Sequence, residues 1–408
     1  MNASRSRRRP SQLLATTLAA SLTALVAAGC ASYVPDLEPE WGRELPAGSS
    51  ALLRLGASES PPNVGSTWLQ REDVRPALEQ SLTWTRSPHA RQHFPIAGVD
   101  HATAAASLER LLELLDSAPN ASTFNAAVQQ EFEFFKSAGW DGAGGGVLFT
   151  GYCTPILAGS AEQDATYTYP LYALPNDLKK NPDGSVLGRE MADGSIEPGY
   201  PERSVIEAGL LQGQNLELVW LRDPMDAYIA HVNGSAIVQL GDGRRLRFGY
   251  AGKNSREYTS LGRELIDDGH VPADEMSLLA IRRWAAANPT LVTSYLNRND
   301  SYVFFTPIEG NPHGSLNKPV TAERTLATDK SLFPRAAAVF VDTNLPIAGG
   351  RTMTYRQMMF DQDTGGAIRT AGRADIYLGV GPAAEAQAGR TRAEGQMYYL
   401  FLRDRVNP

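Results

Sequence analysis

The stretch DQDTGGAIRTAGRADIYLG, from Asp361 to Gly379, restricts the fold and the chemistry of this chain more than any other part of its sequence. It contains Asp363-Thr364-Gly365, the tripeptide with which aspartic proteases present a catalytic carboxylate, and a second acid, Asp375, follows it. An aspartic protease needs two such carboxylates that share one proton. Because the chain has a single Asp-Thr-Gly, the tripeptide does not indicate a protease.

Asp363 and Asp375 could instead form the carboxylate pair of a glycosidase. The deciding quantity is their separation in space, about 5 Å for a retaining enzyme and about 6.5–9.5 Å for an inverting one, and sequence spacing does not determine it. Aspartates in glycine-rich loops are also frequent turn formers, because their side chains hydrogen-bond to nearby backbone groups. The residues alone leave both interpretations open.

Strand-like patterns lie on both sides of this stretch. Apolar and aromatic runs predict strands over residues 146–159, 165–175, 301–307, 336–343, 351–360, 374–380 and 395–403. Residues 227–262 alternate strand-like segments with Asn-Gly and Asp-Gly turns, which predicts a small sheet or barrel. Helical spacing predicts two helices in a hairpin, over 103–119 and 122–139, and a further helix over 273–289.

The amino terminus has the features of an export signal. A basic head with four arginines precedes a charge-free run from Leu13 to Gly29, and Cys30 follows in the sequence AAGC. This ending resembles a bacterial lipobox, in which the cysteine becomes the lipidated first residue. Ala31 is not the aspartate that favours inner-membrane retention, so we expect an outer-membrane lipoprotein that faces the periplasm. A soluble periplasmic protein is the alternative.

Composition excludes several other classes of protein. The chain has 408 residues, 42% hydrophobic and 20% charged, which is typical of globular domains and long enough for two of them. A formal net charge of −7 makes it a poor binder of nucleic acid. Cys153 is the one cysteine besides Cys30, so we expect it to be a half-buried filler without a disulfide partner. No His/Cys/Asp spacing indicates a metal site, and we expect no cofactor.

Eight motifs in a fixed order resemble the membrane-bound lytic murein transglycosylase A family over roughly residues 145–403. They are FTGYCTP (149–155), YPLYALP (169–175), MDAYIAHVNGSA (225–236), YAGKNSREYTSLGRELIDDG (250–269), MSLLAIRRW (276–284), SYVFF (301–305), RTLATDKSLFP (324–334) and DTGGAIRTAGRADIYLG (363–379). The chain departs from the family pattern at Cys153, where a tyrosine is common, and after Pro334, where a glycine is usual.

The resemblance implies a fold that is mainly β with some α, a double-psi β-barrel interrupted by a smaller β-rich insert domain, with a substrate groove between them. Applied to this chain, it implies a signal peptide over residues 1–29 and a tether with irregular structure over 30–95. A helical hairpin and the first part of the barrel domain would occupy 96–155. The insert would span 156–307, and the second part of the barrel, with the catalytic aspartate, 308–408.

The resemblance also implies a reaction. Family members cleave the β-1,4 bond between N-acetylmuramic acid and N-acetylglucosamine in peptidoglycan without water, because the muramoyl C6 hydroxyl attacks its own anomeric carbon. One carboxyl group can then act first as general acid and afterwards as general base. The match assigns that role to Asp375, whose pKa must then lie well above the ordinary value of about 3.9. Asp363 and Asp329 match supporting acidic positions.

The family motifs further imply which residues contact the glycan strand. Aromatic faces and fixed hydrogen-bonding groups suit sugars, and the motif residues of these types are Tyr152, Thr154, Gly234, Ser235, Tyr250, Lys253 and Asn254. A peptidoglycan-binding lipoprotein without activity and a muramidase that hydrolyses with two carboxylates are the alternative functions. Partners among the complexes of cell-wall synthesis, and exo- or endo-cutting, are left open.

Overall fold

The computed structural model describes residues 39–56, 58–181, 185–273 and 275–403. The predicted signal peptide and the lipidation site Cys30 lie outside these residues. Within the described ranges, no helix combines the length and the apolar character needed to cross a membrane.

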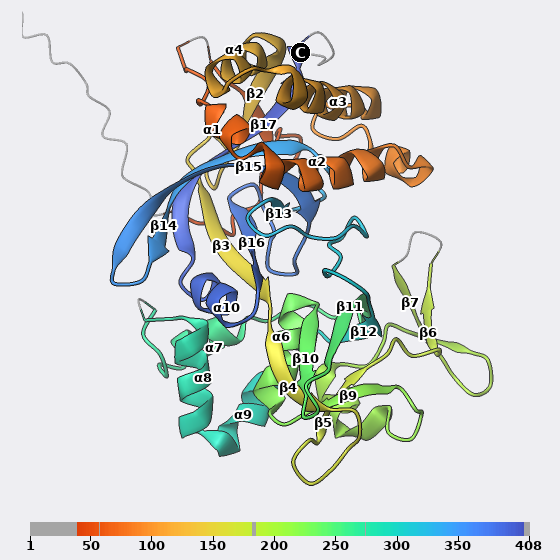
Figure 1. Cartoon of the computed structure of the whole chain (residues 1–408). Coiled ribbons are helices and arrows are strands. Elements are labelled where there is room, and N and C mark those ends of the chain that lie inside the picture. The colour runs from red at the N-terminus through yellow and green to blue at the C-terminus, as the bar shows by residue number, and fades with distance from the viewer. Residues whose placement is uncertain (1–38, 57, 182–184, 274, 404–408) are drawn as a thin grey trace, which may run out of the picture. The chain divides into compact units, whose positions relative to one another are not determined.

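A closed barrel lies at the centre of the first sheet (Figure 1). The eight strands described in this sheet run in the order β1-β2-β17-β14-β15-β13-β16-β3, and β3 also pairs with β17, which closes the part from β17 to β3. The pairs β3–β16 and β13–β15 are parallel. The strands are β1 (Leu52–Arg54), β2 (Phe132–Ser137), β3 (Val147–Thr154), β13 (Thr325–Ala327), β14 (Ala338–Ile347), β15 (Arg351–Asp363), β16 (Arg373–Val380) and β17 (Arg392–Leu402).

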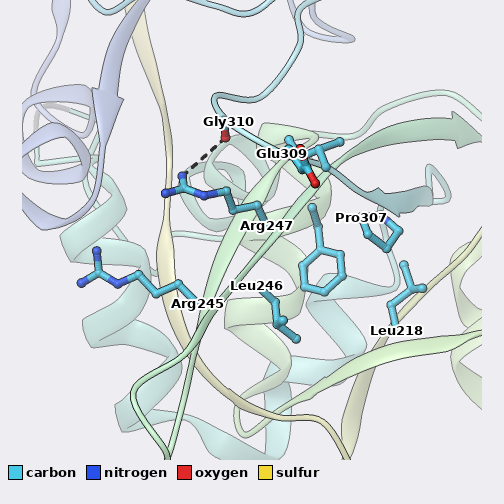
Figure 2. A pocket seen from close by; sticks show the side chains of 9 residues that line it. Leu218, Arg245, Leu246, Arg247, Pro307, Glu309 and Gly310 are labelled. Carbon is cyan, nitrogen blue, oxygen red and sulfur yellow. Dashed lines mark hydrogen bonds between the residues drawn. The ribbon is translucent and has the colours of Figure 1, made fainter.

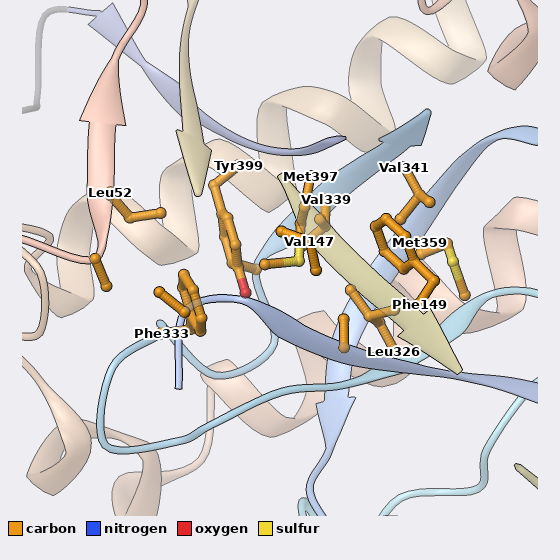
Figure 3. Close-up of a cluster of buried hydrophobic side chains, with 14 of the residues drawn as sticks. Leu52, Val147, Phe149, Leu326, Phe333, Val339, Val341, Met359, Met397 and Tyr399 are labelled. Atoms are coloured by element: carbon orange, nitrogen blue, oxygen red, sulfur yellow. The ribbon is translucent and has the colours of Figure 1, made fainter. Parts of the chain in front are cut away.

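Apolar side chains from all the closing strands fill the barrel. Because successive side chains of a strand point to opposite faces, every second residue of β14 and β17 reaches the interior, as Val339, Val341, Met397 and Tyr399 do. Figure 3 shows Val339, Val341 and Met397 in the same cluster as Phe149, Leu326 and Met359. Tyr399 lies at the other end of the cluster, where its ring stacks on Phe333. The barrel is therefore a packed core, and any substrate has to bind outside it.

Helices cover one outer face of the barrel (Figure 1). Leu78, Leu111 and Phe124 of the helical layer pack in one cluster with Phe340 and Phe360 of the barrel strands. The helices of this layer are α1 (Gly65–Leu69), α2 (Arg71–Thr85), α3 (His101–Ser117) and α4 (Ala121–Glu131), with a 3₁₀ helix η1 (Pro88–His93) between α2 and α3. The predicted amphipathic helix over 103–119 is confirmed, with α3 two residues longer at its start.

Two expectations about this region are wrong. Irregular structure was expected over 30–95, but residues 65–93 are largely helical, because apolar residues such as Val74, Leu78 and Leu82 form a buried face. The helix expected over 122–139 ends at Glu131, and strand β2 follows. Phe132–Ser137 pairs with both β1 and β17, so sheet pairing overrides local helix propensity there.

A second sheet lies within the insert (Figure 1). Its order among the described strands is β12-β11-β10-β4-β9-β5. Strands β6, β7 and β8, which lie between β5 and β9 in the sequence, form a separate small sheet. The strands are β4 (Ile156–Ser160), β5 (Tyr169–Tyr172), β6 (Leu178–Lys180), β7 (Val186–Glu190), β8 (Ile196–Pro198), β9 (Glu217–Leu221), β10 (Ala236–Leu240), β11 (Arg245–Lys253) and β12 (Val303–Pro307). These strands fall within 156–307, which we retain as the proposed limits of the insert.

The insert also contains helices, one of which lies where strand-like segments were expected. Residues 227–233 belong to helix α6, and Gly234 is its left-handed C-cap instead of a hairpin turn. The helix expected over 273–289 is described as α8 followed directly by α9. The helical segments are α5 (Arg203–Val205), the π-helical turn η2 (Ile206–Leu210), α6 (Pro224–Asn233), α7 (Leu261–Asp267), α8 (Leu278–Ala287) and α9 (Pro289–Leu296); α10 (Pro382–Ala388) follows β16 in the barrel part.

Candidate active site

A groove of about 1120 Å³ lies where the barrel meets the insert. Strands β3 and β16 and the loops after β13 and β15 supply its barrel side, while α6, β11 and the segments around α7 and α8 supply its insert side. A smaller pocket of about 440 Å³ lies on the insert, where Arg247 donates a hydrogen bond to the Gly310 carbonyl (Figure 2). The smaller pocket contains none of the predicted site residues, so the groove is the candidate active site.

Asp375 lies in the groove on strand β16. The strand register places it opposite Ala327 of β13 on one side and Thr150 of β3 on the other. Its neighbours Ala374 and Ile376 are fully buried in the barrel core. The Oδ1 atom of Asp375 is inaccessible and has no hydrogen-bond partner among the described residues. A buried carboxyl oxygen without a donor strongly favours the protonated form of the acid.

The pKa of Asp375 agrees with that environment. Burial raises it from the ordinary range to about 7, and the nearby negative charge of Asp363 acts in the same direction. A hydrogen bond from the Thr150 hydroxyl and the positive charge of Arg373 oppose the rise. The side chain therefore holds a proton near neutral pH and can also release it, which a general acid that later acts as base requires.

Asp363 lies at the end of β15, and its oxygens are already engaged. Its Oδ2 accepts a hydrogen bond from the Tyr152 hydroxyl at 2.6 Å, and its Oδ1 accepts from the backbone N–H groups of Ser315 and Thr364, each at 2.8 Å. Burial raises its pKa, while these three hydrogen bonds and the charge of Lys330 lower it. Asp363 thus ties three segments of the barrel together beside Asp375.

Asp329 holds the loop between Asp363 and Asp375. Its Oδ1 accepts from the backbone N–H and the hydroxyl of Ser331, and its Oδ2 accepts from the backbone N–H of Thr370 at 3.0 Å. Thr370 has a φ of 81°, a conformation that β-branched residues rarely adopt. Its hydroxyl also donates to the Trp41 carbonyl at 2.8 Å. Asp329 and Trp41 therefore fix a strained residue of the loop that precedes the acid.

Five of the seven predicted glycan-binding residues line the groove. Tyr250 is half exposed there, while Ser235 is nearly covered. The Tyr152 ring packs against Tyr377 with centroids 5.2 Å apart. The five that line the groove are Tyr152, Gly234, Ser235, Tyr250 and Lys253.

Thr154 and Asn254 are absent from the groove lining among the described residues, so their predicted contact with substrate is not supported. Thr154 is fully buried, and its hydroxyl hydrogen-bonds to the hydroxyls of Tyr377 and Ser235. The Asn254 amide nitrogen donates to two backbone carbonyls of the insert, and its oxygen accepts the backbone N–H of Tyr302. The polar groups of both side chains therefore hydrogen-bond within the protein and hold the walls of the groove in place.

Sequence reasoning missed several lining residues. Thr150, Arg369 and Arg373 all line the groove, and Thr150 and Arg373 act directly on Asp375. Thr150 stands within a family motif, but only the pairing of β3 with β16 reveals that it faces the acid. Cys153 is more deeply buried than expected, and burial raises the pKa of its thiol to about 12, which makes it a poor nucleophile. Within the described residues, no cluster of three or more His, Cys, Asp or Glu could hold a metal ion.

Two family models match the chain, the MltA specific insert domain over residues 148–306 and the 3D domain over residues 324–401. The membrane-bound lytic murein transglycosylase A of Vibrio cholerae serotype O1 (strain ATCC 39315 / El Tor Inaba N16961) is 35% identical over 263 residues. The protein of the same name from Escherichia coli (strain K12) is 33% identical over 261 residues. Each alignment covers 63% of this chain and spans 66% of the length of the relative.

The chain belongs to the membrane-bound lytic murein transglycosylase A family. The crystal structure of the membrane-bound lytic murein transglycosylase from Agrobacterium tumefaciens is 26% identical, with a TM-score of 0.70 over 87% of this chain and 98% of that one. The structure of Escherichia coli MltA with bound chitohexaose is 25% identical, with a TM-score of 0.64 over 90% of this chain and 97% of that one. The predicted MltA resemblance and the predicted mainly β fold are confirmed.

Proposed function

We propose that the chain is a lytic transglycosylase that cleaves the β-1,4 bond between N-acetylmuramic acid and N-acetylglucosamine without water. The observation that carries this proposal is that the groove presents one uncommitted carboxyl group. Asp375 has a buried oxygen without a donor, whereas Asp363 and Asp329 each use both oxygens to hold barrel segments. A reaction in which the substrate supplies its own nucleophile needs a single acid and base.

In the proposed mechanism Asp375 first donates its proton to the glycosidic oxygen of the leaving N-acetylglucosamine. The resulting carboxylate then accepts the proton of the muramoyl C6 hydroxyl as that oxygen bonds to C1, which yields the 1,6-anhydro ring. Because the nucleophile belongs to the same sugar, the attack is intramolecular and gains a high effective concentration. Asp363 raises the pKa of Asp375 and positions Tyr152, and Asp329 positions the loop before the acid.

The five lining residues are the proposed contacts to the glycan. The half-exposed ring of Tyr250 offers an apolar face for a sugar, and Ser235 and Lys253 offer polar groups. The relative from Escherichia coli was crystallised with chitohexaose, an oligosaccharide, which supports a glycan as the occupant of this groove. We also propose attachment to the outer membrane through Cys30, since the two curated relatives are described as membrane-bound; a soluble periplasmic form is the alternative.

Digestion of purified peptidoglycan, followed by mass spectrometry of the soluble products, tests the proposed reaction. We expect muramoyl ends that are one water lighter than hydrolysed ends, because the anhydro ring forms without water. Reducing muramoyl ends would instead identify a hydrolase that uses a second carboxylate. Binding of peptidoglycan without any released product would identify a binding protein.

The rate of glycan cleavage should fall as pH rises through about 7. The proposed general acid works in its protonated form, and the pKa of Asp375 lies at about 7, so each further pH unit removes about tenfold of the active form. Initial rates measured on a soluble glycan between pH 5 and 9 give the descending limb of the pH–rate profile. Asp363→Asn should move the limb to lower pH, because it removes a negative charge that raises the pKa of Asp375. An unchanged limb in Asp363→Asn would show that Asp363 acts by hydrogen bonding alone.

A further inference from the structure

The groove is positively charged although the protein is acidic. The formal net charge of the chain is −7. Within the described lining, the basic side chains outnumber the acidic ones; the basic ones are Arg203, Lys253, Lys330, Arg335, Arg369 and Arg373, and the acidic ones are Asp329, Asp363 and Asp375. Asp375 is moreover protonated, and therefore neutral, at pH values below its pKa of about 7. A neutral glycan gives no reason for this excess of positive charge.

Most of these basic groups have partners within the protein. Arg203 pairs with Glu207 and donates to backbone carbonyls, and Lys330 pairs with Asp361. Arg335 donates to a backbone carbonyl at 3.1 Å, and Arg373 interacts with Asp375. These four therefore have structural roles or act on the proposed catalytic acid.

Lys253 and Arg369 differ from the other four. In the part of the chain that the structure describes, neither forms an ion pair, and the Lys253 ammonium has no hydrogen bond. Arg369 is exposed, and its guanidinium donates one long bond of 3.3 Å to the Gly366 carbonyl of its own loop. Both side chains therefore keep N–H groups that have no acceptor among the described residues, and both line the groove.

The two residues come from opposite sides of the groove to the same region. Lys253 is the last residue of β11 in the insert, and Arg369 lies in the barrel loop that precedes Asp375. The two segments touch nearby, since a Cβ atom added at Gly366 would lie 3.3 Å from the Cβ of Tyr258. Burial lowers the pKa of Lys253, and the positive charge of Arg369 lowers it further. Two like charges in a partly buried place repel each other, and a bound anion would remove that repulsion.

We infer that Lys253 and Arg369 form a carboxylate-binding subsite of the groove, which recognises an acidic substituent on the muramoyl residue of the glycan. This inference rests on the proposed function, because it assigns the groove to a muramoyl glycan. The carboxylate has two possible sources, the lactyl group of peptide-free muramic acid and the acidic residues of the stem peptide. A chitin oligosaccharide carries neither. Arginine and lysine form charge-assisted hydrogen bonds to carboxylates that are stronger than neutral ones.

Binding to three glycans of equal length tests this subsite, with Asp375→Asn as the common background so that no substrate is consumed. The glycans are a neutral chitin oligosaccharide, a peptide-free murein strand and a peptide-bearing murein strand, and calorimetry measures their affinities. Lys253→Gln and Arg369→Gln should each weaken binding of a carboxylate-bearing strand about 10-fold more than binding of the chitin oligosaccharide, because only the former loses a charge-assisted hydrogen bond. Arg351→Gln, an exposed arginine outside the groove lining, is the matched control.

The pattern across the three glycans identifies the source of the carboxylate. Weaker binding of the peptide-free strand alone assigns the lactyl group, whose carboxyl is amide-bonded in the peptide-bearing strand. Weaker binding of the peptide-bearing strand alone assigns the stem peptide, and weaker binding of both strands shows that the subsite accepts either carboxylate. Equal weakening for chitin and murein, or no weakening at all, would overturn the subsite. The products of the unsubstituted enzyme are analysed separately. Anhydro ends, together with variants that weaken murein and chitin binding equally, contradict the subsite alone. Selective weakening of murein binding without anhydro ends in the products contradicts the proposed function alone.

Discussion

Replacing Asp375 with asparagine is expected to lower kcat for glycan cleavage by about 10³- to 10⁴-fold while leaving the fold intact. General acid–base catalysis by a positioned side chain contributes about 10²- to 10⁴-fold, and here one group is proposed to serve both proton transfers. The amide has nearly the shape of the protonated carboxyl, so the packing against Ala374 and Ile376 should persist. Loss of activity would then report lost proton transfer.

Release of soluble muropeptides from purified peptidoglycan measures this effect, and circular dichroism with thermal unfolding checks the fold. Asp193→Asn is the matched control, because Asp193 is an exposed residue between β7 and β8 that lies outside the groove lining. This control should retain full activity. If Asp375→Asn kept activity within about tenfold of the unsubstituted protein, the acid would have to be another residue of the groove.

The family resemblance assigned the proposed acid to Asp375, and part of the environment of this residue is local in the sequence. Its sequence neighbours Ala374 and Ile376 are apolar, and both are fully buried in the structure. Of the two groups that oppose the rise in the pKa of Asp375, only one is close to it in the sequence. Arg373 is close in sequence, but Thr150 reaches the carboxyl through a parallel pairing of strands that are far apart in the chain. Register between distant strands depends on the whole sheet.

The residues that line the groove could be predicted only in part, for a similar reason. Thr154 and Asn254 have the residue types that contact sugars, yet their hydrogen bonds are made inside the protein. Residue type does not distinguish a polar side chain that faces a ligand from one that satisfies buried backbone. Helix α6 was missed although Asp223 caps it, Pro224 opens it and Gly234 ends it. Its apolar residues and the Asn-Gly pair equally suit a strand followed by a turn.

A buried charge cluster beneath the groove explains how the barrel keeps its polar loops in place. Asp361 is fully buried on β15 and forms an ion pair with Lys330. The Thr328 hydroxyl bonds to both of its oxygens, and the Tyr399 hydroxyl donates to Oδ2 at 2.7 Å. These contacts connect β15 and β17 to the segment that carries Asp329. A buried charge of this kind is tolerated because all of its surroundings are complementary to it.

Asp361→Asn is therefore expected to lower the free energy of unfolding by about 3–5 kcal/mol, because it leaves the Lys330 ammonium buried without a compensating charge. Urea unfolding followed by circular dichroism measures the loss. Asp342→Asn, which breaks the partly exposed pair with Arg356, is the control and should cost about 0–1 kcal/mol. The double variant Asp361→Leu with Lys330→Met should recover much of the loss, since it removes both charges together. A cost below about 1 kcal/mol for Asp361→Asn would mean that water compensates Lys330 and that the ion pair does not hold the loop.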